Sequence, residues 1–414
     1  MNSVTYQATR LRPSARIASR PPGAAVVPLS ALAVATVVVL AFNMRTAIGE
    51  IPPVLPDLGL SPAGQSILAT VPVVCFGLAA LAAPALRTRL GEERGLLAVL
   101  AVLLAGVLVR AAWPGGGLFP GTVLVGCAIA VMNVLTPSLV RRRFPGHVGL
   151  MTGVYTTALV AGGALAAATT VPLRDATGGS LHLALGIWAL PIAIALVAWL
   201  PQRRHRALPA VGGGREAIRA LGRSRVAWYV TLFMGLQSLL YYAPLSWLPA
   251  IHRDQGIDPT TAGFLLSTLN LISIPTTFLA PVLAHRMADQ RKAVAGCVAL
   301  TATGLLGILL APSSTALVWV IILGLGQGAA LSLALLMIVL RAADDHTAAR
   351  LSSMAQGFGY LLAAAGPLVM GLLHAATGSW NIALAWLVGL CSLELLAGLA
   401  AGRTRIVRAH EPRD

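Results

Sequence analysis

The segment VVVLAFNMRTAIGEIPP (37–53) places one arginine, Arg45, near the end of an apolar run. An ionisable side chain inside a membrane-spanning run costs about 2.5–3.5 kcal/mol on insertion scales, and such residues usually serve a function. A guanidinium there stays charged, and its planar fork of N–H donors suits a carboxylate, a nitro group or a small anion. Arg45 is therefore the first candidate for ligand binding. The alternatives are that it reaches the surface or pairs structurally with Glu50, which we expect in a loop.

Other polar side chains lie inside apolar runs, where they could contact the same ligand. Gln237 and Tyr241 are four residues apart and so share one face of a helix. Gln356 and Tyr360 repeat that spacing. The remaining candidates are Asn133, Tyr155, Asn270 and Gln327. Their amides and hydroxyls could bond a polar ligand and their rings could flank a flat one; hydrogen bonding between helices is the equally supported alternative.

The composition indicates a membrane protein. Of the 414 residues 57% are hydrophobic and 11% are charged, and the mean hydropathy is +0.80. A soluble domain carries about 25% charged residues. The net charge of +16 does not indicate nucleic-acid binding, because the basic residues form short clusters between apolar runs. The cysteines and histidines lack metal-binding spacing, and there is no phosphate-binding glycine loop, so we expect no metal, cofactor or direct use of ATP.

Twelve apolar runs are long enough to cross a bilayer as helices, which takes about 20 residues. They lie near 27–48, 63–86, 95–113, 118–140, 148–172, 181–200, 226–249, 261–284, 292–311, 315–340, 351–376 and 380–402. With the N-terminus inside, 26 of the 30 Lys and Arg residues fall in cytoplasmic segments. Only Arg110, Arg174 and Arg253 then fall in external loops. Because basic residues concentrate in cytoplasmic loops, both termini are predicted to be cytoplasmic.

The chain divides into two similar halves. We expect a basic cytoplasmic tail (1–26), a six-helix bundle (27–201), a cytoplasmic central loop (202–225), a second six-helix bundle (226–402) and a second cytoplasmic tail (403–414). LAAPALRTRLGEER (81–94) aligns with FLAPVLAHRMADQR (278–291) at an offset of 197 residues. The fifth spans share their Met and terminal Gly spacing at a nearly equal offset. Two such stretches in equivalent spans indicate an internal duplication.

These motifs resemble a known family. RTRLGEER is similar to the loop 2–3 signature of the major facilitator superfamily, G-x-x-x-D-R-x-G-R-R, in Arg89, Gly91 and Arg94, although the Asp is missing. Five stretches are similar to the cyanate-permease and 2-nitroimidazole-transporter branch: NMRTAI (43–48), span two (71–91), NVLTPSLVRRRFP (133–145), GLMTGVYTTAL (149–159) and FMGLQSLLYYAPLSWLP (233–249). The resemblance implies two six-helix bundles around a central substrate site. It also implies that Arg89, Gly91, Arg94 and, in the second copy, Arg286 control the conformational cycle.

The sequence thus favours a secondary transporter in the inner membrane that works by alternating access. A small anion such as cyanate ranks first as substrate because of Arg45, and export of a nitroimidazole-like or other drug-like molecule is the alternative. An integral-membrane enzyme or a sensor is disfavoured, because no catalytic cluster and no output domain is evident. We expect a monomer in the lipid bilayer. Proton symport, antiport and uniport all remain open, since Glu394, the one acid well inside a span, is expected to be structural.

Overall fold

The described part of the chain folds into helices, as expected. The structure, a computed structural model, describes residues 31–407 except 91, 145–146, 202–220 and 344. The first half contains α1 (Ala31–Gly49), α2 (Ile51–Val54), α3 (Pro62–Leu90), α4 (Glu92–Ala112), α5 (Pro114–Arg143), α6 (Val148–Ala176), α7 (Leu181–Gly186) and α8 (Ala189–Trp199). The second contains α10 (Arg225–Asp254), α11 (Pro259–His285), α12 (Arg291–Leu310), α13 (Ala316–Leu340), α14 (Asp345–Ala363), α15 (Ala365–Thr377) and α16 (Trp380–Ala401).

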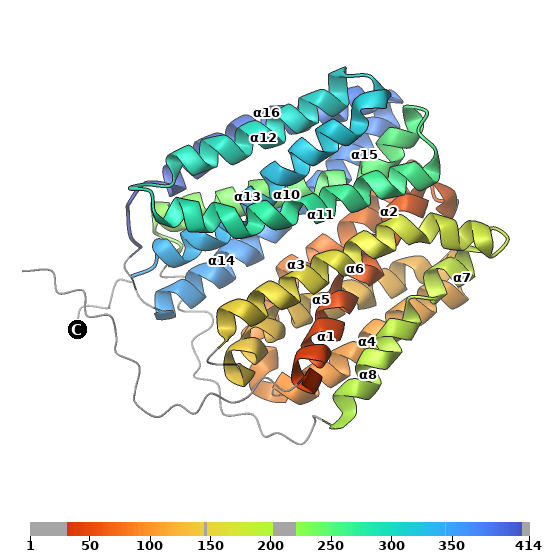
Figure 1. Ribbon diagram of the computed structural model, residues 1–414, viewed down its shortest axis with the longest axis horizontal. Helices are drawn as coiled ribbons and strands as arrows, with labels where there is room; N and C mark the ends of the chain where they lie inside the picture. Colours follow the sequence, from red (N-terminus) through yellow and green to blue (C-terminus); the bar gives the residue numbers. More distant parts are fainter. Residues whose placement is uncertain (1–30, 91, 145–146, 202–220, 344, 408–414) are drawn as a thin grey trace, which may run out of the picture.

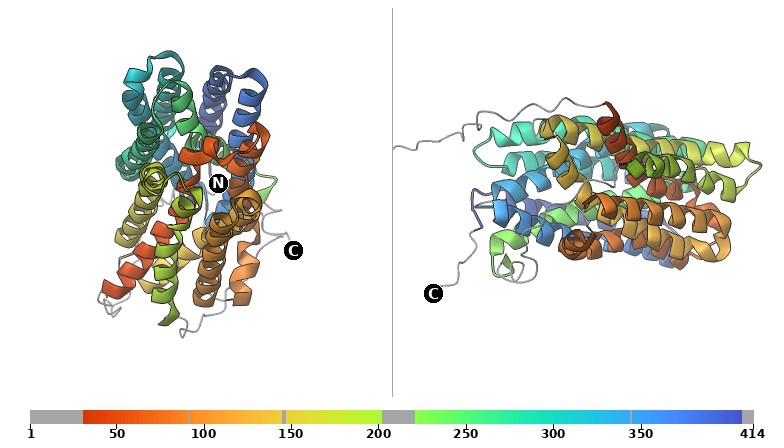
Figure 2. Two further views of the ribbon diagram at one scale, coloured as in Figure 1. Left: turned by 90° about the vertical axis from the view of Figure 1, so that its right-hand side faces the viewer. Right: turned by 90° about the horizontal axis from the view of Figure 1, so that it is seen from below.

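The two halves form two bundles that lie side by side (Figure 1). Turned by 90°, the same two groups remain separate, with the green and blue helices above the red, orange and yellow ones (Figure 2). Within the bundles α1 packs on α6, α4 on α5, α11 on α13 and α10 on α14. The bundles meet where α6 contacts α11 and where α3 contacts α14 and α15. This confirms the predicted all-helical, two-bundle architecture; of the expected boundaries, 1–26 and 202–220 lie outside the described residues.

The twelve predicted spans correspond to the observed helices. Among the described residues, eleven helical stretches are long and apolar enough to cross a membrane, and Pro62–Leu78, the part of α3 whose side chains are described, is a shorter apolar helix. Two spans are interrupted. The sixth span consists of α7 and α8, and α8 begins two residues before Pro191. The eleventh span consists of α14 and α15, and α15 begins two residues before Pro367. Each proline lacks the N–H that would donate to the carbonyl four residues earlier, so the hydrogen bond that would cross the break is missing. Pro244 and Pro275 lie inside uninterrupted helices, so proline alone does not interrupt a span.

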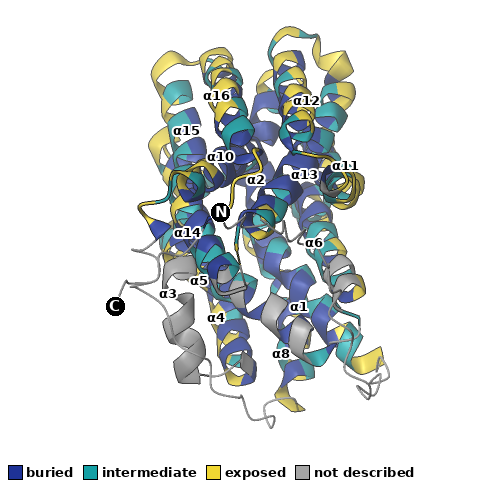
Figure 3. Cartoon of the chain, turned by 90° about the vertical axis from the view of Figure 1, so that its left-hand side faces the viewer, coloured by how far each residue is buried: buried dark blue, intermediate teal, exposed yellow. Residues whose placement is uncertain are grey.

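The outer surface of the bundles is apolar. Leu190 is 63% exposed, Leu279 57% and Leu396 64%. Exposed residues follow the outer helices, whereas the helices between them are largely buried (Figure 3). Contiguous apolar surface of this extent is unfavourable in water and favourable in hydrocarbon. The surface therefore identifies the chain as a multi-pass membrane protein.

The end of the first span differs from the expected loop. The chain continues as α2 and a 3-10 turn (Leu55–Leu58), and Glu50 is fully buried. Glu50 forms an ion pair with Arg110, which is 1% exposed at the end of α4. Arg110 also donates to the carbonyl oxygen of Ala47 at 2.9 Å, so it serves an unpaired carbonyl in the last turn of α1. The predictions that Glu50 and Arg110 lie in external loops are therefore wrong, because each neutralises the other inside the bundle.

The predicted duplication has a counterpart in the structure. In the first half, Arg143 lies 3.6 Å from Glu93 and its guanidinium lies 5.1 Å from the ring centroid of Trp199. In the second half, the buried Arg341 donates to Gln290 and to the carbonyl oxygen of Ala401 at 2.8 Å. Gln290 follows Glu93 by 197 residues and Arg341 follows Arg143 by 198. The same kind of arginine contact thus recurs at the same offset as the sequence repeat.

Close approach of α1 and α6 holds Arg45 in position. A Cβ atom on Gly162 would lie 2.2 Å from the carbonyl oxygen of Phe42, so only glycine fits there. We expect Gly162→Ala to push α1 away from α6 and to lower the free energy of unfolding by about 1–3 kcal/mol, as overpacking does. Thermal unfolding of the purified protein measures this. Gly389→Ala is the control, since its Cβ would meet nothing within 4 Å; an equal effect of both changes would contradict the packing argument.

Candidate substrate-binding site

Arg45 extends from the first bundle to the second. Its Nη1 atom lies 3.5 Å from the hydroxyl oxygen of Tyr241 in α10. Its guanidinium lies 5.6 Å from the ring centroid of Tyr241 and 5.8 Å from that of Tyr242, distances at which a cation is attracted to an aromatic face. The alternative that Arg45 pairs with Glu50 is wrong, since Glu50 pairs with Arg110. Arg45 therefore lies at the boundary of the two bundles, against aromatic rings.

A cavity opens beside Arg45, between the bundles. Its walls come from α1 and α6 of the first bundle and from α10, α11 and α13 of the second. Four of the nine residues predicted to bind substrate line it: Arg45, Tyr241, Asn270 and Gln327. Thr156, Ser273 and Thr277 add further hydroxyl groups, and the rest of the wall is apolar or glycine. An apolar cavity with few polar groups is typical of small-molecule sites.

Arg45 begins a chain of hydrogen bonds in which each group donates to the next. The hydroxyl of Tyr241 donates to Oδ1 of Asn270 at 3.0 Å, and Nδ2 of Asn270 donates to the carbonyl oxygen of Leu266 at 3.0 Å. The oxygen of Tyr241 is thereby left to accept from Arg45. In the described part of the chain, no carboxylate pairs with this guanidinium, and its surroundings are tyrosines. A cation without a paired anion at a cavity wall favours binding of a negatively charged or strongly accepting group.

Gln327 supplies the opposite kind of group. Its Nε2 atom donates to the carbonyl oxygen of Leu240 at 2.7 Å, which fixes the orientation of the amide. Its Oε1 atom is buried and has no partner in the described structure. Since a buried acceptor without a partner costs roughly 1–3 kcal/mol, a donor on a bound molecule would be favourable at this position.

The other predicted binding residues lie outside this cavity's wall. Gln237 is buried and donates to Oγ of Ser238 and to the carbonyl oxygen of Met234. Gln356 donates to Oγ of Ser352 at 2.7 Å. The side-chain amide nitrogens of both residues therefore donate to groups of their own helices. These bonds lie within one helix, so they are neither ligand contacts nor the bonds between helices that the alternative interpretation expects.

The remaining candidates are Tyr360, Tyr155 and Asn133, none of which lines the cavity. The ring of Tyr360 packs against Phe76 and Tyr242, with centroids 6.0 and 6.2 Å apart. Tyr155 and Asn133 are half-buried in α6 and α5. Tyr242, which the sequence analysis did not select, contacts Arg45 more directly than any of these. Its position directly after Tyr241 was the available signal, but the four-residue spacing rule assigns neighbours to different faces.

Two of the residues predicted to control the conformational cycle are described with their side chains, at the end where both described chain ends are found. Arg94 and Arg286 are exposed there. The side chain of Arg89, and Gly91, lie outside the described residues. At the second-half counterpart, Arg291 forms an exposed ion pair with Asp289. Glu394 is 1% exposed, and neither of its oxygens has a partner in the described structure. It lies in α16, away from the cavity wall.

Two membrane-embedded bundles around a shared cavity define the class of the protein, a multi-pass membrane transporter. The sequence profile of the Major Facilitator Superfamily matches residues 33–367, and the chain belongs to this family. It is 38% identical over 381 residues to the 2-nitroimidazole transporter of Escherichia coli (strain K12), covering 91% of this chain and 96% of that one. It is 29% identical over 348 residues to the cyanate transport protein CynX of the same organism, covering 83% and 90%. These relatives confirm the resemblance to the cyanate-permease and 2-nitroimidazole-transporter branch.

Two further comparisons agree. The chain is 41% identical over 380 residues to the uncharacterized transporter YycB of Bacillus subtilis (strain 168), covering 91% of this chain and 94% of that one. The crystal structure of the nucleoside transporter NupG superposes with a TM-score of 0.70 at 14% identity, over 90% of this chain and 99% of that one. The D-xylose–proton symporter gives a TM-score of 0.66 at 14% identity, over 90% and 97%. At these identities the two structures support the fold alone.

Proposed function

We propose that the protein is a secondary transporter that moves a small solute by alternating access, and that Arg45 binds the solute. A small anion such as cyanate, or a related organic anion, is the substrate class that the site supports best. The observation that carries this proposal is the guanidinium of Arg45, which faces the cavity and has no carboxylate partner among the described residues. We further propose that both termini lie on the cytoplasmic side of the inner membrane, which the distribution of the basic clusters supports.

A second candidate is a flat nitro-heteroaromatic molecule. Its nitro oxygens would accept from Arg45, its ring would lie against the tyrosines, and a ring N–H would donate to the unpaired Oε1 of Gln327. The similarity to a 2-nitroimidazole transporter supports the same candidate. Gln327 favours it over cyanate, which has no donor to offer.

Transport into liposomes tests the function. Purified protein is reconstituted, and uptake of labelled cyanate, small carboxylates and 2-nitroimidazole is compared with uptake into protein-free vesicles. Accumulation of at least one solute, saturable and competed by the others, supports transport. Chemical conversion of a solute without movement would point to an enzyme, and binding without movement would point to a sensor.

Gln327→Leu separates the two candidates. We expect it to weaken binding of 2-nitroimidazole roughly fivefold to tenfold, since a net hydrogen bond contributes about 1 kcal/mol, and to leave cyanate binding unchanged. Isothermal titration of the purified protein with each solute measures this. Gln356→Leu is the control, because Gln356 bonds within its own helix. Equal losses of affinity for the two solutes would show that Gln327 shapes the cavity and does not accept a hydrogen bond from the solute.

A further inference from the structure

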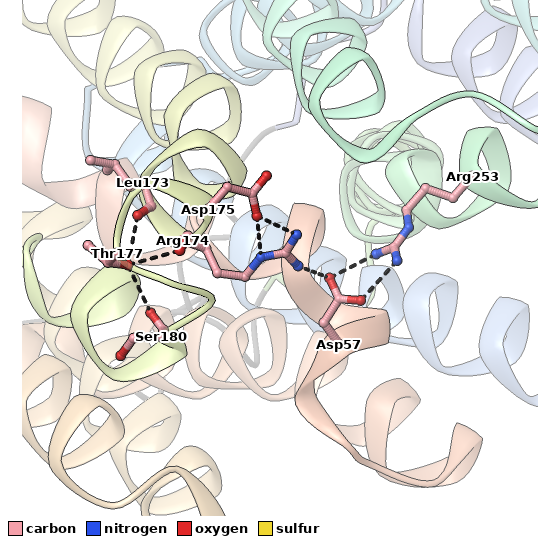
Figure 4. Close-up of polar contacts among 7 residues, drawn as sticks. All are labelled: Asp57, Leu173, Arg174, Asp175, Thr177, Ser180 and Arg253. Carbon is pink, nitrogen blue, oxygen red and sulfur yellow. Dashed lines mark hydrogen bonds and ion pairs between the residues drawn. The ribbon is translucent and has the colours of Figure 1, made fainter.

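A group of charged residues joins the two bundles at the end opposite the described chain ends. Asp57, in the 3-10 turn after α2, accepts two bonds from Arg253 at the end of α10, at 2.9 and 3.0 Å. It also accepts one from Arg174 at the end of α6, at 2.6 Å. Figure 4 shows the carboxylate of Asp57 between the two guanidiniums, with Asp175 on the far side of Arg174. Asp57 and Arg174 belong to the first bundle and Arg253 to the second, so the carboxylate bridges the boundary.

The contacts of Asp57 are stronger than those of an ordinary surface pair. Its side chain is 24% exposed and that of Arg253 23%, so both are largely removed from water. A two-bond contact between a guanidinium and a carboxylate adds geometric specificity to the charge. Arg174 has a second acceptor in Asp175 at 2.9 Å, within the same bundle.

The boundary is also tightly packed just inside this group. Oγ of Ser267 in α11 donates to the carbonyl oxygen of Ala164 in α6 at 2.7 Å. A Cβ atom on Gly263 would lie 2.6 Å from the carbonyl oxygen of Ala167. Charged contacts and close packing between the bundles therefore occur together at the Asp57 end.

We propose that Asp57 and Arg253 form a gate that closes this end of the transporter, which the basic clusters predict to be external. Transport then requires the gate to break in every cycle. Arg174 positions Asp57 and keeps its charge compensated when Arg253 moves away, which makes the opening less costly. The inference rests on the proposed alternating access; it assigns the residues that control one of the two states.

Distances between labels test the gate directly. Ala176 and Ser314 are exposed residues at this end, one in each bundle. Spin labels are attached there after replacing the native cysteines, and the distance distribution is recorded in nanodiscs. We expect Asp57→Asn to increase the ratio of the long-distance to the short-distance population roughly tenfold, as loss of a charge-assisted contact would. Asp175→Asn is the matched control, since it removes the same charge nearby but no contact between the bundles.

Each outcome has one meaning. A shift in Asp57→Asn alone supports the gate. No shift in either variant, or an equal shift in both, overturns it, because the contact between the bundles would then contribute nothing of its own. The measurement needs no substrate, so it is independent of the liposome assay. If a solute of the liposome assay is transported but Asp57→Asn leaves the distances unchanged, the gate is wrong and the proposed function stands. If Asp57→Asn alone shifts the distances but none of these solutes is transported, the gate stands and the proposed substrate is wrong.

A cross-link provides a second test that does not depend on the stability of Asp57→Asn. Cysteines at Asp57 and Arg253, joined by a short bifunctional thiol reagent, would hold the bundles together at this end. We expect transport to stop on cross-linking and to return when the link is reduced. Transport by the same double-cysteine protein before the reagent is added is the reference for both steps. Unchanged transport with the first link in place would contradict the gate.

Discussion

Arg45→Ala is expected to weaken binding of an anionic substrate roughly tenfold to a hundredfold, because a hydrogen bond to a charged group contributes about 1.5–3 kcal/mol. The variant removes the cation that lines the cavity and leaves Tyr241 bonded to Asn270. Arg45→Lys is expected to recover only part of the affinity, because an ammonium keeps the charge but lacks the planar fork. Titration of folded, monodisperse protein with the transported solute gives both values.

The control for this prediction is Arg403→Ala, which removes an exposed arginine just beyond α16. A purely structural Arg45 would give a different pattern: Arg45→Ala would reduce the yield of folded protein, and the protein that survived would bind normally. Unchanged affinity in folded Arg45→Ala would end the ligand role and leave Arg45 as a residue that joins the bundles through Tyr241.

Glu50→Ala is expected to lower the free energy of unfolding by about 3–5 kcal/mol, because it leaves the charge of Arg110 buried without a partner. Both side chains are almost fully buried, so water cannot compensate for the loss. Unfolding in mixed micelles, followed by the loss of helical signal, measures the change. The effect is expected on stability, since neither residue belongs to the wall of the cavity beside Arg45.

Two further variants make the second prediction specific. Glu50→Leu combined with Arg110→Met is expected to recover most of the stability, because replacing both members of a buried pair by apolar groups is often nearly neutral. Asp289→Ala, which breaks an exposed pair with Arg291, is expected to cost less than about 1 kcal/mol. If Glu50→Ala were no more harmful than Asp289→Ala, the buried pair would not contribute as its geometry indicates.

The positions of the spans could be predicted from the sequence because each needs only a local signal, an apolar run of sufficient length. The prediction is wrong at Glu50 and Arg110, which are 60 residues apart. A charged residue at the end of an apolar run is predicted to lie in a loop. Only the packing of α1 against the rest of its bundle brings the two charges together. The breaks near Pro191 and Pro367 could not be assigned from the sequence, because Pro244 and Pro275 lie inside uninterrupted helices.

The site could be predicted in part for the same reason. Arg45 is conspicuous as a charge in an apolar run, and Asn270 and Gln327 as amides in such runs. Local spacing does not distinguish an amide that faces the cavity, as Gln327 does, from one that bonds within its helix, as Gln237 does. No sequence pattern identified Asp57, because its role depends on its contact with Arg253 in the other bundle.

Two of the side-chain contacts between the bundles share a numerical relation. Arg45 and Tyr241 are 196 residues apart, and so are Asp57 and Arg253. This is one residue short of the repeat offset of 197, so each side chain contacts the immediate neighbour of its own counterpart, as residues near a twofold axis do. The counterpart of Arg253 in the first half is Pro56, which carries no charge, so two copies of the first half could not form the contact of Asp57. This ion pair therefore exists once in the molecule, and it requires two unlike halves in one polypeptide.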